Sequence, residues 1–165
     1  IQIFCGIRNA EAKRFRWDWI KSDRVIVPAW FQLDGQTVQG SKTKGDDWVM
    51  LNLPPAIFSW LEQYRSDGKF VSPSNNMIRK LRGEFAKLPH PIKWGRNTMR
   101  HTFCTMALSY FEGDAGKTTN WSRHTNAQIL HKHYLSSQRP LSEAQEFFNI
   151  VPGGSESVRV VEFQG

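Results

Sequence analysis

The sequence NTMRHTF at residues 97–103 is the stretch that does most to decide the fold of this chain. It places Arg100 at the start of an apolar run, and this pattern predicts a helix over residues 100–111. Two further segments, CGIRNAE at residues 5–11 and KHYL at residues 132–135, add a second arginine and a tyrosine. Cations that clamp a phosphate and a phenol that attacks it are parts needed for phosphodiester transfer without a metal.

The composition indicates one folded, basic domain. The chain has 165 residues, of which 39% are hydrophobic and 22% charged, which is enough for a sizeable core. Its 22 Lys and Arg outnumber 15 Asp and Glu, and the net charge of +7 favours nucleic acid first and an acidic membrane surface second. Cys5 and Cys104 lie in apolar settings, which favours reduced thiols in a cytosolic protein over a disulfide framework. No apolar run is long enough to span a bilayer. Because the charge favours nucleic acid first, we expect no membrane partner.

Periodicity and capping signals predict a mainly helical α+β fold with a small antiparallel sheet near its start. Asn9 can cap a helix over residues 10–17, and Ser74 or Asn75 can cap one that reaches Phe85. Further helices are predicted after Pro54 and over residues 100–111, 117–121, 127–133 and 141–150. Strands are predicted over residues 24–27, 37–41, 48–51 and 158–163, with a hairpin turn at 42–47. Residues 1–5 resemble the last turn of a helix already under way, which suggests a piece of a longer protein.

Several short motifs follow one another along the chain in a fixed order. They are Gly6-Ile7-Arg8, Trp17, Lys42, Val49-Met50-Leu51, Pro54, the segment at 97–103, His124 and Tyr134. This order and spacing resemble the catalytic domain of the tyrosine recombinase, or phage-type integrase, family, from the segment around Arg8 to the helix after Tyr134. The resemblance implies a tyrosine-recombinase catalytic domain over residues 1–150 and a C-terminal tail over residues 151–165 that can pack against a neighbouring copy.

The resemblance also implies an activity, site-specific cleavage and rejoining of DNA through a 3′-phosphotyrosine intermediate. Arg8 and Arg100 would hold the non-bridging oxygens of the scissile phosphate, because a guanidinium stays charged and donates in a planar fork. Tyr134 would attack the phosphorus and store the bond energy, so that resealing needs no ATP. Lys42 would protonate the departing 5′ oxygen, and His124 would donate a hydrogen bond to the phosphate.

Some of these assignments have competitors within the sequence. Lys44 competes with Lys42, although the spacing to the strand at 49–51 favours Lys42. Trp121 competes with His124, whose preceding residue is an arginine where the family has glycine.

Asn97 is the clear departure from the family pattern, which usually has histidine there. An amide can hydrogen-bond but cannot take a proton at neutral pH, as the family's histidine can. For His101, packing or bonding inside its helix is favoured over a part in catalysis.

The partner implied by the resemblance is a double-stranded DNA attachment site, bound by a tetramer of this protein from a bacterial or phage mobile element. The resemblance implies no metal and no nucleotide cofactor. DNA contacts would be mostly to phosphates and would weaken with salt. The basic residues that would supply them are Lys13, Arg14, Arg16, Lys80, Arg82, Lys87, Lys93 and Arg96.

Other readings of the sequence stay open. The same fold can serve as a DNA-binding module that has lost catalysis, or as a type IB topoisomerase that only relaxes supercoils. A metal-binding protein is a third alternative, because His124, His131 and His133 lie close together in sequence, but no Cys, Asp or Glu at a ligand spacing completes a zinc site.

Overall fold

Helices dominate the computed structural model of the chain. They make up about 52% of it, and small antiparallel β elements complete a mixed α+β fold. Among the described residues, no helix is long and apolar enough to cross a membrane. The structure describes residues 1–41, 45–51, 53–65, 74–92, 94–95, 97–124 and 126–153. Lys42, Lys44, Lys93, Arg96 and the predicted strand at 158–163 therefore lie outside the described residues.

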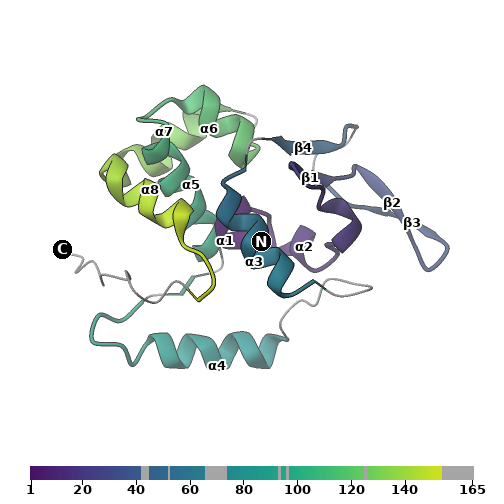
Figure 1. Ribbon diagram of the computed structural model, residues 1–165, viewed down its shortest axis with the longest axis horizontal. Coiled ribbons are helices and arrows are strands. Elements are labelled where there is room, and N and C mark those ends of the chain that lie inside the picture. Colours follow the sequence, from purple (N-terminus) through teal and green to yellow (C-terminus); the bar gives the residue numbers. More distant parts are fainter. Residues whose placement is uncertain are drawn as a thin grey trace.

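The elements form two groups joined by the first helices (Figure 1). The α-helices are α1 (Gln2–Cys5), α2 (Asn9–Ala12), α3 (Pro55–Gln63), α4 (Asn75–Phe85), α5 (Thr98–Tyr110), α6 (Ala115–Ser122), α7 (Ala127–Tyr134) and α8 (Leu141–Asn149). The 3₁₀ turns are η1 (Trp17–Trp19) and η2 (Leu135–Ser137), and the strands are β1 (Arg24–Val27), β2 (Trp30–Leu33), β3 (Gln36–Gln39) and β4 (Trp48–Leu51). In Figure 1 the strands lie on the right, α5 to α8 on the left, and α1 to α3 between them.

The core is built where the start of the chain packs against α5. Cys5, Ile7 and Phe103 are fully buried there, and Phe148 of α8 packs on Phe103 with its ring nearly perpendicular. Gly6 ends α1 with a left-handed φ of 61°, and a methyl group at this position would overlap the Phe103 ring. Glycine is therefore required here, both for the backbone conformation and for the close approach of α5.

The strands pair differently from the sequence prediction. β4 pairs antiparallel with β1, so that Met50 lies opposite Val25, and β3 pairs with β2. The expected hairpin between the strands at 37–41 and 48–51 is therefore wrong, and β2 was not predicted at all. The reason is the Asp34-Gly35 turn, whose φ values of 50° and 77° suit a tight hairpin between β2 and β3.

The first predicted helix is much shorter than expected. Only Asn9–Ala12 is helical, with Arg8 rather than Asn9 at the N-cap position. Arg16 is extended, with φ −128° and ψ 150°, and the chain then turns through η1. This break lets Trp19 bury its ring edge-on against Phe15 and Phe31, so tertiary packing overrides local helix propensity.

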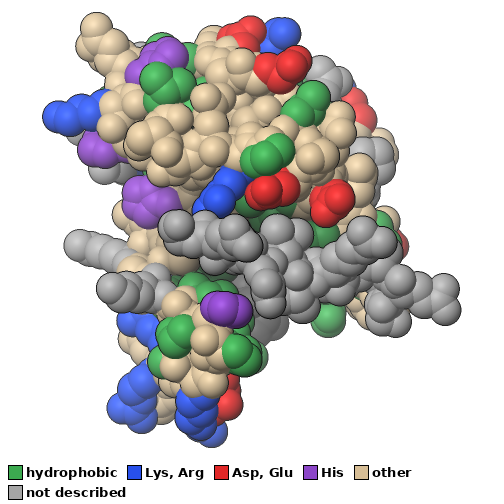
Figure 2. All heavy atoms as spheres, turned by 90° about the vertical axis from the view of Figure 1, so that its left-hand side faces the viewer, with side chains coloured by type: hydrophobic (Ala, Val, Ile, Leu, Met, Phe, Trp, Pro, Cys, Tyr) green, Lys and Arg blue, Asp and Glu red, His purple; other side chains and the backbone are tan. Residues whose placement is uncertain are grey.

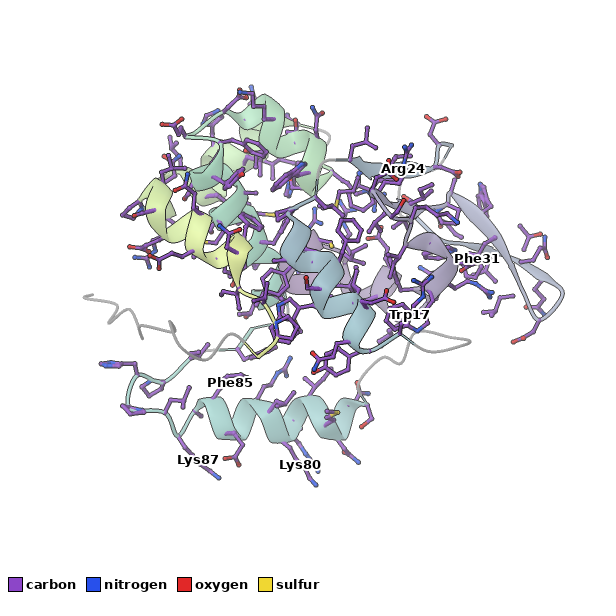
Figure 3. All side chains as sticks on the ribbon, in the orientation of Figure 1. Trp17, Arg24, Phe31, Lys80, Phe85 and Lys87 are labelled. Atoms are coloured by element: carbon purple, nitrogen blue, oxygen red, sulfur yellow. The ribbon has the colours of Figure 1, made fainter. Side chains whose placement is uncertain are left out.

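Helix α4 lies apart from the rest of the fold (Figure 1). It begins as predicted, with the Ser74 hydroxyl accepting a hydrogen bond from the backbone N–H of Met77 at 3.2 Å. None of the residues of α4 that the structure describes is buried. Figure 3 shows Phe85 directed toward the body of the molecule, while Lys80 and Lys87 point away from it. Phe85 stacks on Trp94, with 5.0 Å between ring centroids.

Candidate functional site

Distant segments of the chain meet at the C-terminal end of α6. The guanidinium of Arg100 donates one hydrogen bond to the carbonyl of Ser122 at 2.6 Å and another to the carbonyl of Gly6. The guanidinium of Arg8 donates to the carbonyl of Arg123 at 3.4 Å. Both predicted phosphate-binding arginines therefore contact the same backbone segment, although they come from the start of α2 and from α5.

The buried carboxylate of Glu11 contacts two arginine side chains, those of Arg8 and Arg123. Glu11 is 1% exposed, and its carboxylate lies 3.6 Å from Arg8 Nη1 and accepts from the Arg8 backbone N–H at 3.0 Å. It also accepts from Arg123 Nη1 at 2.8 Å. One carboxylate thus faces two guanidinium groups, which keeps Arg8 in place while its side chain stays 28% exposed.

Arg123 stands at the position where the family resemblance predicts glycine, and its side chain connects several parts of the fold. Its backbone is left-handed, with φ 58°, as the C-cap of α6. Its guanidinium lies over the Trp48 ring, 4.2 Å from the centroid, and donates to the hydroxyl of the buried Ser41. This contact joins Ser41 to the C-cap of α6.

Tyr134 is the last residue of α7 and lies beside α5. Its side chain is buried, with 5% exposed, and its hydroxyl lies 2.7 Å from His101 Nδ1. Burial raises the pKa of the phenol, and interaction with Cys104 raises it further, while the positive charge of Arg100 opposes this shift. At neutral pH the phenol is therefore protonated.

His124 lies between the arginines and the tyrosine. Its Nδ1 is 2.7 Å from the Ser122 hydroxyl, and its ring centroid is 6.1 Å from that of Tyr134. Burial lowers the pKa of His124 to about 4, and the charges of Arg100 and Arg8 act in the same direction. The imidazole is therefore neutral at pH 7, and it can donate a hydrogen bond through the nitrogen that carries its proton.

The structure brings together four of the six predicted site residues, which are Arg8, Arg100, His124 and Tyr134. His101, which contacts Tyr134, joins them, and we call these five residues the Arg–Tyr cluster. Lys42 is outside the described residues, and Asn97 is an exposed N-cap residue of α5 whose side chain makes no capping hydrogen bond.

Sequence reasoning missed or misjudged part of this arrangement. His101 was expected to pack or bond inside its helix, yet it is exposed and contacts Tyr134 across to α7. Trp121, the competitor of His124, instead packs in the aromatic core against Phe111 and Phe148. A signal for His101 was present, because it stands one helical turn after Asn97 and therefore shares its helix face.

Histidine, Lys and Arg side chains gather in places on one face of the molecule (Figure 2). Figure 2 shows histidine side chains gathered on the upper part of one face, with Lys or Arg side chains among them. Lys and Arg side chains gather again at the lower end of this face. The last turn of α7 carries His131, Lys132 and His133. A groove between η1 and α3, lined in part by Arg16, Trp17 and Phe58, shares no described residue with the Arg–Tyr cluster.

Within the described part of the chain, no group of three or more His, Cys, Asp or Glu side chains is arranged to hold a metal ion. Comparison with known proteins finds no matching family model, no matching curated protein and no matching solved structure.

Proposed function

We propose that this chain is the catalytic domain of a tyrosine-type site-specific DNA recombinase. Cleavage and rejoining of DNA would pass through a 3′-phosphotyrosine intermediate. The observation that carries the proposal is that Arg8 and Arg100, from segments far apart in the sequence, both bind the backbone at Ser122 and Arg123, directly before His124, whose ring lies against that of Tyr134.

The chemistry follows from the groups in the Arg–Tyr cluster. Arg8 is partly exposed and has a planar fork of N–H donors, which suits the non-bridging oxygens of a phosphate. Arg100 is held by two backbone carbonyls, so its charge is fixed in position before substrate arrives. Fixed cations of this kind stabilise the charge that develops on the phosphoryl oxygens during the attack.

Tyr134 is the proposed nucleophile and His124 a neutral hydrogen-bond donor to the phosphate. Attack of the Tyr134 oxygen on phosphorus breaks the bond to the 5′ oxygen, which needs a proton as it leaves. We assign that proton to Lys42, whose neighbour Ser41 is bound by Arg123. The basic side chains on the surface would bind the DNA backbone, and four copies would assemble on two duplexes.

Covalent capture from a randomised library tests the proposal whatever the target sequence is. The protein is incubated with nicked duplexes whose central sequence is randomised. After cleavage beside the nick, the short released fragment diffuses away, so resealing is prevented and the covalent intermediate accumulates. Adducts that survive denaturation are recovered and sequenced. We expect adducts with the unmodified protein and none with Tyr134→Phe, whereas Tyr64→Phe, a change at an exposed tyrosine, serves as the matched control.

The other outcomes identify the competing functions. Specific DNA binding without an adduct would support a DNA-binding module of this fold, and the burial of Tyr134 is the observation that favours it. Adducts of no sequence preference, together with relaxation of supercoiled DNA, would support a type IB topoisomerase. Adducts that persist in Tyr134→Phe would remove this tyrosine as the nucleophile.

A further inference from the structure

The contact between His101 and Tyr134 joins two helices at the reacting atom of the proposed chemistry. His101 Nδ1 lies 2.7 Å from Tyr134 Oη, and the ring centroids are 5.6 Å apart with an interplanar angle of 39°. Both α5 and α7 are fixed in the core, α5 through Phe103 and α7 through Leu130, which are each fully buried. The pair is therefore held within hydrogen-bonding distance before any substrate binds.

The proposed attack requires a proton acceptor at this position. The Tyr134 phenol is protonated at neutral pH, because burial raises its pKa, and a neutral phenol is a weak nucleophile. Cys104 lies beside the same phenol, but burial raises the pKa of its thiol to about 11, so it is protonated too. Asn97 carries an amide that does not accept a proton at neutral pH, and His124 directs Nδ1 toward the Ser122 hydroxyl.

His101 meets the requirements for an acceptor. Burial lowers its pKa, and the charges of Arg100 and His133 lower it further, so the ring is neutral at pH 7. With its own proton on Nε2, the ring accepts the Tyr134 hydroxyl hydrogen at Nδ1. The packing around the ring is enough to lower the pKa, although His101 as a whole residue remains exposed to solvent.

We propose that His101 is a catalytic residue that takes the phenolic proton of Tyr134 during strand cleavage and returns it during resealing. This inference rests on the proposed function. In cleavage, the Oη–H proton passes to His101 Nδ1, the Oη–P bond forms, and the bond from phosphorus to the 5′ oxygen breaks. The leaving oxygen takes its proton from a separate donor. In resealing, the 5′ hydroxyl attacks phosphorus and gives its proton back to that donor, the Oη–P bond breaks, and the departing Tyr134 oxygen recovers its proton from His101.

The test measures the rate of adduct formation on a nicked duplex recovered from the randomised library. His101→Gln keeps a polar side chain but removes the base, and we expect it to slow cleavage by about 10²–10⁴-fold. His131→Gln is the matched control, because it removes an exposed histidine of α7 that makes no described contact with Tyr134. Added imidazole should restore part of the rate of a His101→Ala variant, since a diffusible base can occupy the vacated space.

A second substrate distinguishes a role of His101 as general base for Tyr134 from a role as general acid for the leaving group. When sulfur replaces the 5′ bridging oxygen, the leaving group needs no proton. The rate of His101→Gln should stay low on this substrate, because the defect lies in the attacking group.

Full recovery on the sulfur substrate would instead place His101 on the leaving-group side and overturn the inference. So would a His101→Gln variant that forms adducts at the unmodified rate. If the unmodified protein forms no Tyr134-dependent adduct on any sequence, the proposed function fails and this inference fails with it.

Discussion

Glu11 and Arg123 form a buried ion pair, 2.8 Å between Oε1 and Nη1, although 112 residues separate them in the chain. Glu11 is 1% exposed and Arg123 8% exposed, so water does little to screen either charge. The same carboxylate also faces Arg8, which links this pair directly to the proposed phosphate-binding site.

Removal of the carboxylate should destabilise the fold strongly. Glu11→Gln leaves the buried charge of Arg123 without a counter-charge, and we expect the free energy of unfolding to fall by about 3 kcal/mol. Urea unfolding followed by tryptophan fluorescence measures this change. Glu62→Gln, which breaks the exposed pair with Arg65, is the control and should cost about 0–1 kcal/mol. Equal effects of the two substitutions would contradict the structural role of Glu11.

The left-handed backbone of Arg123 predicts an order among its variants. Arg123→Ala and Arg123→Gly both lose the ion pair and the contact with Trp48. Glycine adopts a φ of 58° without the steric cost of a Cβ atom, so the glycine variant should be more stable than the alanine variant by about 1 kcal/mol. The difference is read from the urea midpoints of the two variants, and an alanine variant at least as stable as the glycine variant would argue against this backbone conformation.

The depressed pKa of His124 predicts how stability depends on pH. The imidazole titrates at 6.5 in the unfolded chain and at about 4 in the folded protein. Between these values the unfolded chain binds a proton that the folded protein does not, so the free energy of unfolding decreases as the pH falls from 6.5 toward 4. The lowered pKa of His101 acts in the same direction.

Unfolding measured across this pH range tests the prediction, and His124→Gln should flatten the dependence. The NMR signal of the His124 ring gives its pKa directly. A midpoint near the ordinary value of 6.5 in the folded protein would refute the buried, neutral state of this side chain.

The two thiols should be unreactive until the protein unfolds. Cys5 and Cys104 are fully buried, and burial raises the pKa to about 12 for Cys5 and about 11 for Cys104. Because the thiolate is the reactive form, we expect almost no reaction with a disulfide reagent at about pH 8 and complete reaction in denaturant. Rapid labelling of one thiol in the folded protein would mean that the packing around it opens, and a Cys104→Ala variant would show which thiol it is.

Local sequence signals predicted the individual strands and helix starts better than they predicted which strands pair. The strands Arg24–Val27 and Trp48–Leu51 and the Ser74 cap of α4 are confirmed, because alternation and capping depend on nearby residues. Strand pairing was wrong, since it depends on which apolar face is buried, and Val25 meets Met50 only in the folded chain. The early end of α2 likewise follows from the packing of Trp19, which no local pattern contains.

In the candidate site, too, the residues in short motifs were predictable and the contacts between distant residues were not. Arg8, Arg100, His124 and Tyr134 were predicted from motif order, and the structure brings them together, while their roles stay predictions. The contributions of Glu11 and Arg123 could not be predicted, because each depends on a contact across most of the chain. His101 was assigned a role inside its own helix for the same reason, since its partner is on α7.

The isolation of α4 has a consequence for how the protein melts. The helix has 11 residues and buries none of its described side chains, and helices of about 12–15 residues or fewer are only marginally stable in water. Its amide hydrogens should exchange with solvent long before those of α5, and far-UV circular dichroism should decline gradually before the cooperative transition. Tryptophan fluorescence and circular dichroism would then report different midpoints, and we expect unfolding of the whole chain to depart from two-state behaviour.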